Sequence, residues 1–288
     1  MSLSPRLSMY TSANSACPRA ASPSSEARAR LPSNDMKQPV QAFLGNLGIK
    51  LRSAMPRGHL KLFYSMLQGR SFAPKHIMDV GANHGKWTRV ALRYFPDAYY
   101  TLIEPQDHMR AEIADLLTRS SKIRWVGAGA SDTSGSLPFT IFSRDDRSSF
   151  TPTPEAAVAN GMRQVEIPVT TLNEVVRTGD APLPDMVKID AEGFDLRVLA
   201  GASELVGKTD IFLLEAAICG DLMTRTTGSG KVFENSLGKV METMADAGYR
   251  ILDITDLNRS PKHEALWLCE LAFLRNGSRL LDGIDSFD

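Results

Sequence analysis

The sequence predicts an α/β fold, in which a mostly parallel sheet is covered by helices on both faces. Short apolar segments of strand length alternate with segments whose apolar residues recur every three or four positions, as on one face of a helix. The chain has 288 residues, and 43% of them are apolar. That content is ample for a buried core and excludes disorder along the whole chain.

The predicted strands are apolar runs bounded by polar residues or glycine. They cover residues 76–80, 98–103, 122–127, 137–143, 164–170, 185–190, 210–215, 249–254 and 266–274. The strands on either side of the polar loop 144–161 predict a hairpin-like insertion and not another strand–helix unit. The last two strands are close enough in sequence for a hairpin, so we expect the final strand to run antiparallel.

Helices are predicted where apolar residues share one face. They cover about 39–53, 58–67, 87–95, 109–117, 196–206 and 233–244. Pro96 stops the third of these helices, and Gly248 closes the last one.

Composition shifts divide the chain into four parts. Residues 1–36 are rich in Ser, Ala, Pro and Arg and contain only two acids, which predicts a disordered N-terminal extension. An Arg-rich, acid-poor transit peptide is the alternative for this segment. We expect a helical segment at 37–70, a main α/β domain at 71–276 with its hairpin insertion at 132–171, and a tail at 277–288.

Charge and cysteine content restrict the class of protein. The 33 basic and 33 acidic side chains give a net charge of zero, which argues against nucleic acid as a partner bound through bulk phosphate attraction. Cys17, Cys219 and Cys269 show neither disulfide nor zinc spacing. No apolar run is long enough to span a membrane, and the N-terminus lacks a secretory signal. We therefore expect a cytoplasmic protein; the oligomeric state is not indicated.

Acidic residues stand at the ends of four predicted strands. They are Asp79, Glu104, Asp190 and Glu215. In an open α/β sheet, ligands bind in the crevice beyond the carboxyl ends of the strands. One such acid could simply cap the following helix, but four together predict a ligand site.

The loop after the first strand is rich in glycine but does not match a dinucleotide fingerprint. Gly81 and Gly85 allow a tight turn and a close approach of backbone to a ligand. Asn83 and Lys86 occupy positions where a dinucleotide fold needs glycine. The pyrophosphate cradle is therefore incomplete.

The second acid predicts a nucleoside ligand. Glu104 follows Gly81 by 23 residues, the place where an acid binds the hydroxyls of a ribose. S-adenosylmethionine carries a ribose but no phosphates, and its ammonium group is suited to a carboxylate such as Asp79, directly or through water.

Three sequence blocks together resemble the FkbM family of S-adenosylmethionine-dependent methyltransferases. They are Asp-Val-Gly-Ala-Asn-His-Gly at 79–85, Glu-Pro at 104–105, and Lys-Ile-Asp-Ala-Glu-Gly-Phe at 188–194 with the tail Val-Leu-Ala-Gly-Ala at 198–202. The resemblance spans about 77–274 and implies a Rossmann-like class I fold with a seven-stranded sheet. It also implies methyl transfer, typically to oxygen on sugars or natural products. Asn173 and Asp195 depart from the family pattern, which puts details of the acceptor site in doubt.

The resemblance also implies which residues line the cofactor site. They are Asp79, Gly81, Asn83, Gly85, Glu104, Ser131 and Asp132.

Catalytic candidates lie in the third block and after the next strand. Strand alternation places Lys188 and Asp190 on one side, and Glu192 joins them if the chain stays extended. A hydroxyl acceptor needs a group that takes its proton, so Asp190 or Glu192 is the expected base and Lys188 tunes it. The alternative is a structural Lys188–Asp190 ion pair, with Asp190 as a helix cap. Glu215 is a further candidate; with Asp190 it would suit a divalent metal, but no ligand spacing predicts one.

Three other features remain open. His84, in the glycine loop, is a second candidate base or a plain loop residue. Trp87 would touch a ligand or belong to the core. The insertion 144–154 would form a lid over the acceptor or a surface loop.

The sequence thus predicts a methyltransferase that uses S-adenosylmethionine and acts on a hydroxyl of a sugar or small metabolite. Two alternatives remain at this stage. One is an NAD(P)-dependent oxidoreductase, and the other is a non-catalytic nucleoside-binding module on the same fold.

Overall fold

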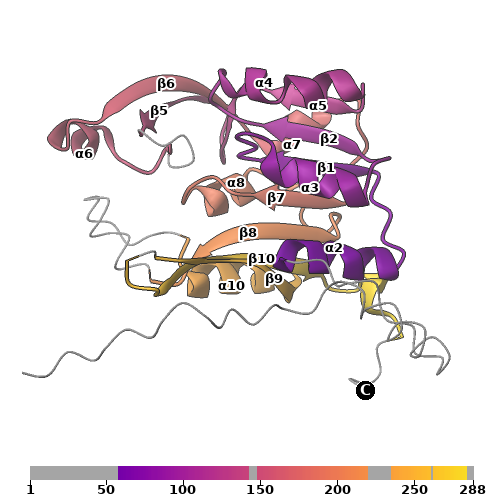
Figure 1. Ribbon diagram of the computed structural model, residues 1–288. Helices are drawn as coiled ribbons and strands as arrows, with labels where there is room; N and C mark the ends of the chain where they lie inside the picture. Colours follow the sequence, from indigo (N-terminus) through magenta and orange to yellow (C-terminus); the bar gives the residue numbers. More distant parts are fainter. Residues whose placement is uncertain (1–57, 143–147, 220–234, 261, 284–288) are drawn as a thin grey trace, which may run out of the picture. The chain divides into compact units, whose positions relative to one another are not determined.

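The computed structural model describes residues 58–142, 148–219, 235–260 and 262–283. These residues form a seven-stranded sheet, a smaller three-stranded sheet and the helices around them (Figure 1). The predicted extension 1–36 and the predicted helix 39–53 lie outside the described residues.

The main sheet has the strand order β3-β2-β1-β7-β8-β10-β9. Its strands are β1 (His76–Val80), β2 (Tyr99–Ile103), β3 (Ile123–Val126), β7 (Met186–Ile189), β8 (Ile211–Ala217), β9 (Tyr249–Arg259) and β10 (Leu266–Arg275). Neighbours among the first five strands in this order are parallel, and β10 runs antiparallel to both β8 and β9. This topology confirms the mostly parallel sheet with an antiparallel last strand.

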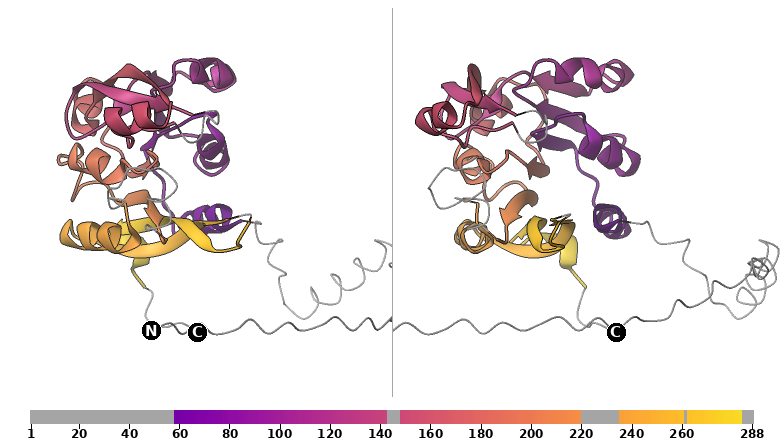
Figure 2. Two further views of the ribbon diagram at one scale, coloured as in Figure 1. Left: turned by 90° about the vertical axis from the view of Figure 1, so that its left-hand side faces the viewer. Right: turned by 60° about the vertical axis from the view of Figure 1, so that its left-hand side comes forward.

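Helices cover both faces of this sheet. One face carries α2 (His59–Gly69), α3 (Lys86–Tyr94) and α5 (Ala114–Arg119), which follows the short α4 (Met109–Glu112). The other face carries α7 (Leu172–Arg177), α8 (Asp195–Ala200) and α10 (Leu237–Asp246). Figure 2 shows the sheet between these two layers. The short helix η3 (Arg279–Leu281) packs with the first layer through Leu280. No helix in the described ranges is long and apolar enough to cross a membrane.

Because side chains alternate along each strand, the sheet has an apolar core on each of its two faces. Four charged residues lie on one of these faces. Asp79, Lys188, Glu215 and Glu270 are each flanked in sequence by two residues that pack in the core under α7, α8 and α10. Because successive side chains of a strand point to opposite faces, these four residues belong to the α2–α3 face. They lie toward the carboxyl ends of the parallel strands, with Asp79 beside Lys188 and Glu215 beside Glu270 in register.

The insertion forms the smaller sheet. Strands β5 (Gly135–Ile141) and β6 (Arg163–Thr170) pair antiparallel, and β4 (Gly129–Ala130) pairs parallel to β6. Part of the predicted polar loop is a helix, α6 (Pro154–Ala159). The Thr153 hydroxyl accepts a hydrogen bond from the backbone N–H of Ala156, and Pro154 occupies the first turn. Both are favourable helix starts, so local capping outweighs the polar composition.

Two predicted helices are shorter than expected. The helix predicted over 109–117 is interrupted at Ile113, where the backbone leaves the helical region. The helix predicted over 196–206 ends at Ala200. A Cβ on the next residue, Gly201, would lie 2.1 Å from the carbonyl oxygen of Ser131, so the chain approaches β4 there as only glycine allows.

Candidate active site

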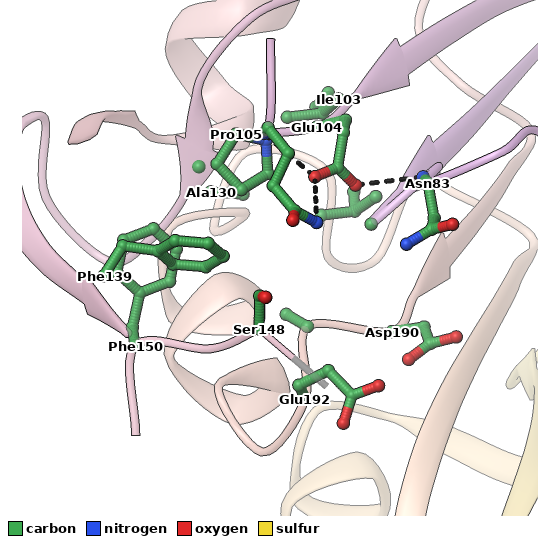
Figure 3. Close-up of a pocket in the computed structure, with 15 residues that line it drawn as sticks. Asn83, Ile103, Glu104, Pro105, Ala130, Phe139, Ser148, Phe150, Asp190 and Glu192 are labelled. Carbon is green, nitrogen blue, oxygen red and sulfur yellow. Dashed lines mark hydrogen bonds between the residues drawn. The ribbon is translucent and has the colours of Figure 1, made fainter. Parts of the chain in front are cut away.

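A first cavity of about 100 Å³ opens beyond the ends of β1, β2 and β7. Its lining combines strand ends with the insertion, as Figure 3 shows: Phe139 and Phe150 form one side, and Asp190 and Glu192 lie across from them. The two phenyl rings have centroids 4.7 Å apart. A Cβ at Gly129 would lie 2.4 Å from the ring of Phe150, so glycine at that position is what lets this aromatic wall form.

Glu104 is the most buried acid in the lining, with 3% of its surface exposed. Its carboxylate accepts hydrogen bonds from the backbone N–H of Asn83 at 2.9 Å and of Gln106 at 3.0 Å, and from the Gln106 amide at 3.2 Å. Burial raises its pKa, and these hydrogen bonds partly offset the increase. Since an ionised carboxylate has about four acceptor positions, Glu104 keeps capacity for one ribose hydroxyl.

The glycine loop approaches the end of β7 closely. A Cβ on Gly81 (φ +74°) would lie 1.9 Å from the carbonyl oxygen of Asp190. Asn83 also has a positive φ of 45°, a left-handed conformation that asparagine adopts more readily than most other non-glycine residues. Its backbone N–H donates to Glu104, so that hydrogen bond helps to hold the turn in place.

The chain turns sharply after Asp190 and does not stay extended as the prediction for Glu192 required. Glu192 has φ 51° and Gly193 has φ 90°. Glu192 lines the first cavity only, whereas Asp190 lines both this cavity and a second one. Helix α8 begins at Asp195 without a side-chain cap, so the alternative role of Asp190 as a helix cap is wrong.

A second cavity of about 520 Å³ adjoins the first and shares Gly81, Asn83 and Asp190 with it. Its walls come from the start of α2, the glycine loop, α3, the end of β7 and the middle of β9 and β10. Its other charged or aromatic lining residues are His59, Lys61, His84, Lys86, Trp87, Lys188, Asp256 and Glu270. Pockets that hold drug-sized ligands usually have about 300–1,000 Å³. The first cavity is smaller than this range, and the second lies within it.

Lys188 forms the structural ion pair that the sequence offered as an alternative. Its Nζ lies 3.1 Å from Asp190 Oδ2 and 3.3 Å from Asp79 Oδ1. Burial favours the neutral amine, but the attraction of Asp190, Asp79 and Glu270 outweighs it and raises the pKa of Lys188. Asp79 is fully buried, accepts a hydrogen bond from Thr88 at 2.6 Å and lines neither cavity.

Four other predicted site residues also lie outside both cavity linings: Gly85, Ser131, Asp132 and Glu215. Gly85 (φ +67°) starts α3, and a Cβ there would press on Ile113 and Leu116. The Ser131 hydroxyl donates to Asp132, which pairs with Arg197 at 2.7 Å.

The ionisation of Glu215 is shifted by its surroundings. Burial, together with the nearby carboxylates of Asp190 and Glu192, raises its pKa well above the ordinary value. Within the described ranges, no three His, Cys, Asp or Glu side chains are arranged to hold a metal ion.

Two of the open features have a definite place. Trp87 lines the second cavity and also packs edge-on against Tyr64, with ring centroids 5.8 Å apart. His84 lies on the same cavity, 3.8 Å from a carboxylate oxygen of Glu112. Ser148 and Phe150 of the insertion line the first cavity, whereas residues 143–147 lie outside the described residues.

The sequence analysis missed Glu270, which lines the second cavity from β10. A signal was present, because Glu270 is the one charged residue in the apolar run 266–274. An acid in the middle of a buried strand has to be paired or to serve a site. Nothing local shows which of the two applies, since the pairing of β10 with β8 and β9 decides what surrounds it.

Residues 79–251 match a family model described as the methyltransferase FkbM domain. A comparison with curated proteins gave no match. Among solved structures, a precorrin-6y C5,15-methyltransferase from Geobacter metallireducens GS-15 has 14% identity and a TM-score of 0.39, covering 77% of this chain and 93% of its own. A 1,6-didemethyltoxoflavin-N1-methyltransferase from Burkholderia thailandensis has 14% identity and a TM-score of 0.40 (87% and 93%). A putative O-methyltransferase from Klebsiella pneumoniae has 13% identity and a TM-score of 0.44 (85% and 92%).

Proposed function

Because this chain belongs to the FkbM methyltransferase family, a class of enzymes whose methyl donor is S-adenosylmethionine, we propose that it methylates a hydroxyl group of a sugar or another small metabolite. We place this reaction in the cytoplasm. The described cysteines Cys219 and Cys269 are free thiols, which fits a reducing compartment.

The observation that carries the proposal is the pair of joined cavities. The first has an apolar aromatic side and the buried carboxylate of Glu104, which suit an adenosine. The second is larger and polar, and it begins at the residues that the two cavities share. A donor bound with its ribose at Glu104 therefore extends toward the second cavity, where the acceptor binds.

The lining of the second cavity favours a hydroxyl-rich acceptor. The carboxylates of Asp190, Asp256 and Glu270 accept hydrogen bonds from hydroxyl groups. The ring of Trp87 offers an apolar surface among them, as the C–H face of a sugar requires. Lys61 and Lys86 add positive charge at the walls, so an acceptor that also carries an anionic group is compatible with this cavity.

The predicted catalytic residues take different roles in this proposal. Asp190 lies where the two cavities meet and orients the acceptor hydroxyl, while Lys188 holds Asp190 in position through the 3.1 Å contact. Glu192 lies on the donor side of that junction. Glu215 lies close to Asp190 and Glu192, where its raised pKa favours the neutral acid.

The donor-site residues of the proposal fall into two sets. Gly81, Asn83 and Glu104 face the donor directly. Asp79, Gly85, Ser131 and Asp132 support the loops around it.

The test is a methyl-transfer assay with mass-spectrometric detection on a panel of methyl glycosides, sugar acids, alcohols and amines. We expect products methylated on oxygen. Products methylated only on nitrogen, or no product from any hydroxyl compound, would contradict the proposal.

Asp190→Asn tests the role of the junction residue. We expect it to lower kcat at least tenfold and to change the Kd of S-adenosylhomocysteine less than threefold, since Asp190 acts on the acceptor. The matched control is Asp246→Asn at an exposed position of α10, which should change neither quantity. An equal loss of turnover and donor affinity in Asp190→Asn would assign Asp190 to donor binding.

A further inference from the structure

Glu270 lies on the acceptor side of the site, but the catalytic roles proposed above do not include it. It stands in the middle of β10, lines the second cavity, and accepts a hydrogen bond from the hydroxyl of Thr255 on the neighbouring β9. Thr255 is itself buried, with 2% of its surface exposed. The Glu270 carboxylate is therefore fixed in orientation by a rigid strand pair and reaches the cavity from its floor.

The other acids of the site are less suited to accept a proton from a bound hydroxyl. The carboxylate of Asp190 already has a partner, because one of its oxygens lies 3.1 Å from Nζ of Lys188. Glu192 lines only the first cavity, and Glu215 lines neither. Asp256 also lines the second cavity but is solvent-exposed on β9, where an acid is screened by water.

We propose that Glu270 is the general base of the acceptor site and takes the proton of the acceptor hydroxyl during methyl transfer. This inference rests on the proposed hydroxyl methylation. It assigns the base to β10, and it leaves Asp190 to orient the acceptor.

The step balances in atoms and charge. The acceptor oxygen forms a bond to the methyl carbon of the donor, and the carbon–sulfur bond breaks with its electron pair remaining on sulfur. The hydroxyl proton passes to the carboxylate of Glu270. A sulfonium cation, a neutral alcohol and a carboxylate thereby become a neutral thioether, a methyl ether and a carboxylic acid.

The ionisation of Glu270 suits this role. Burial raises its pKa from the ordinary 4.5 to about 7, while Lys188 and the Thr255 hydroxyl limit the increase. A base whose pKa lies near the working pH combines a useful ionised fraction with good proton affinity. Each element that packs around Glu270 contributes titratable or charged groups. They are His59, Lys61 and Tyr64 of α2, Asp79 of β1, Lys188 of β7, Asp190 after β7, Glu215 of β8 and Asp256 of β9.

The first experiment does not depend on turnover. Isotope-edited infrared titration of the full-length enzyme, with 13C-labelled glutamate carboxylates, follows carboxyl protonation between pH 5 and 9. We expect one carboxyl band that titrates near pH 7 and is missing from Glu270→Gln. If removing Glu270 removes no band that titrates in this range, the proposal is overturned.

The second experiment measures turnover with a hydroxyl acceptor that the wild type uses. We expect Glu270→Gln to lower kcat at least 100-fold and to leave the Kd of S-adenosylhomocysteine within threefold. The rise of kcat with pH through about 7 should disappear in this variant, and Glu270→Asp should restore part of the activity. Glu242→Gln, exposed on α10, is the matched control and should behave as wild type.

The outcomes separate this inference from the function on which it rests. A wild-type enzyme that methylates no hydroxyl compound refutes the proposed function, and the inference with it. A wild-type enzyme that methylates hydroxyl groups, combined with a Glu270→Gln variant that keeps more than a tenth of kcat, refutes the inference alone. Thermal unfolding of each variant shows whether a loss of activity reflects loss of the fold.

Discussion

Glu104→Gln tests the donor site at the residue that joins the glycine loop to the end of β2. The carboxylate accepts three hydrogen bonds inside the protein, two of them from backbone N–H groups, and has one acceptor position left for the ribose. Glutamine keeps the shape, but only its oxygen accepts, and its NH2 group faces one of the backbone donors. Alanine would leave both backbone donors without a partner, so glutamine is the more informative change.

The expected magnitudes follow from these hydrogen bonds. Losing a charged hydrogen bond to the ribose costs about 1.5–3 kcal/mol, which corresponds to a Kd for S-adenosylhomocysteine weaker by about 10- to 150-fold. One buried N–H without an acceptor lowers the free energy of unfolding by about 1–3 kcal/mol. Because burial raises the pKa of Glu104, donor affinity of the wild type should also begin to fall at a higher pH than for an ordinary glutamate as the solution is acidified.

Isothermal titration calorimetry gives the Kd, and thermal unfolding of the same samples gives the stability. Glu166→Gln, at an exposed position on β6, is the control and should leave both unchanged. A Kd for Glu104→Gln within threefold of wild type, in a protein that remains folded, would refute the assignment of Glu104 to the ribose.

Three further predictions concern stability. Lys188→Met leaves Asp79 buried without its cation and should lower the free energy of unfolding, measured by chemical denaturation, by about 3–5 kcal/mol. Arg177→Met removes an exposed ion pair and should have no measurable effect. Equal effects of the two substitutions would contradict a stabilising buried pair. Gly201→Ala should lower the melting temperature, because its Cβ would lie 2.1 Å from a backbone oxygen, and Gly238→Ala in α10, where nothing lies within 4 Å, should raise it slightly; a neutral Gly201→Ala would show that the contact relaxes. The pKa of Glu270 is higher in the folded chain (about 7) than its ordinary 4.5, so its contribution to stability is fully present below about pH 4.5 and is lost as the pH rises through 7, by up to about 3 kcal/mol. Glu270→Gln should remove this part of the pH dependence of the free energy of unfolding, which urea titrations measure. If the free energy of unfolding of the variant changes between pH 5 and 8 as it does in the wild type, the prediction is wrong.

The sequence predicted best what depends on local pattern. The strand at 76–80 has the predicted bounds, because an apolar run between a lysine and a glycine leaves little freedom at either end. The acids Glu104 and Asp190 were found for a related reason, since each comes directly after a strand. A residue directly after a parallel strand lies at the carboxyl edge of the sheet, independently of the rest of the fold.

What sequence reasoning missed depends on contacts between distant segments. The alternation of side chains along β7 does not extend to Glu192, because the backbone is left-handed at Glu192 and Gly193. This turn contacts the insertion, where the Thr151 hydroxyl donates to the Glu192 carbonyl. Glu270 was hidden because its neighbours come from β8 and β9. The roles of Ser131 and Asp132 as cofactor residues stay predictions.

The first turn of helix α2 lines the larger cavity, and the residues that follow pack in the core. Phe63, Tyr64 and Leu67 are fully buried against the sheet, while His59, Leu60 and Lys61 border the larger cavity. If the acceptor binds in this cavity, a new acceptor preference can arise through changes at His59 and Lys61 with little effect on folding, whereas Leu60 also packs against the core. Relatives with different acceptors should accordingly diverge at positions 59 and 61 and keep bulky apolar residues at 63, 64 and 67.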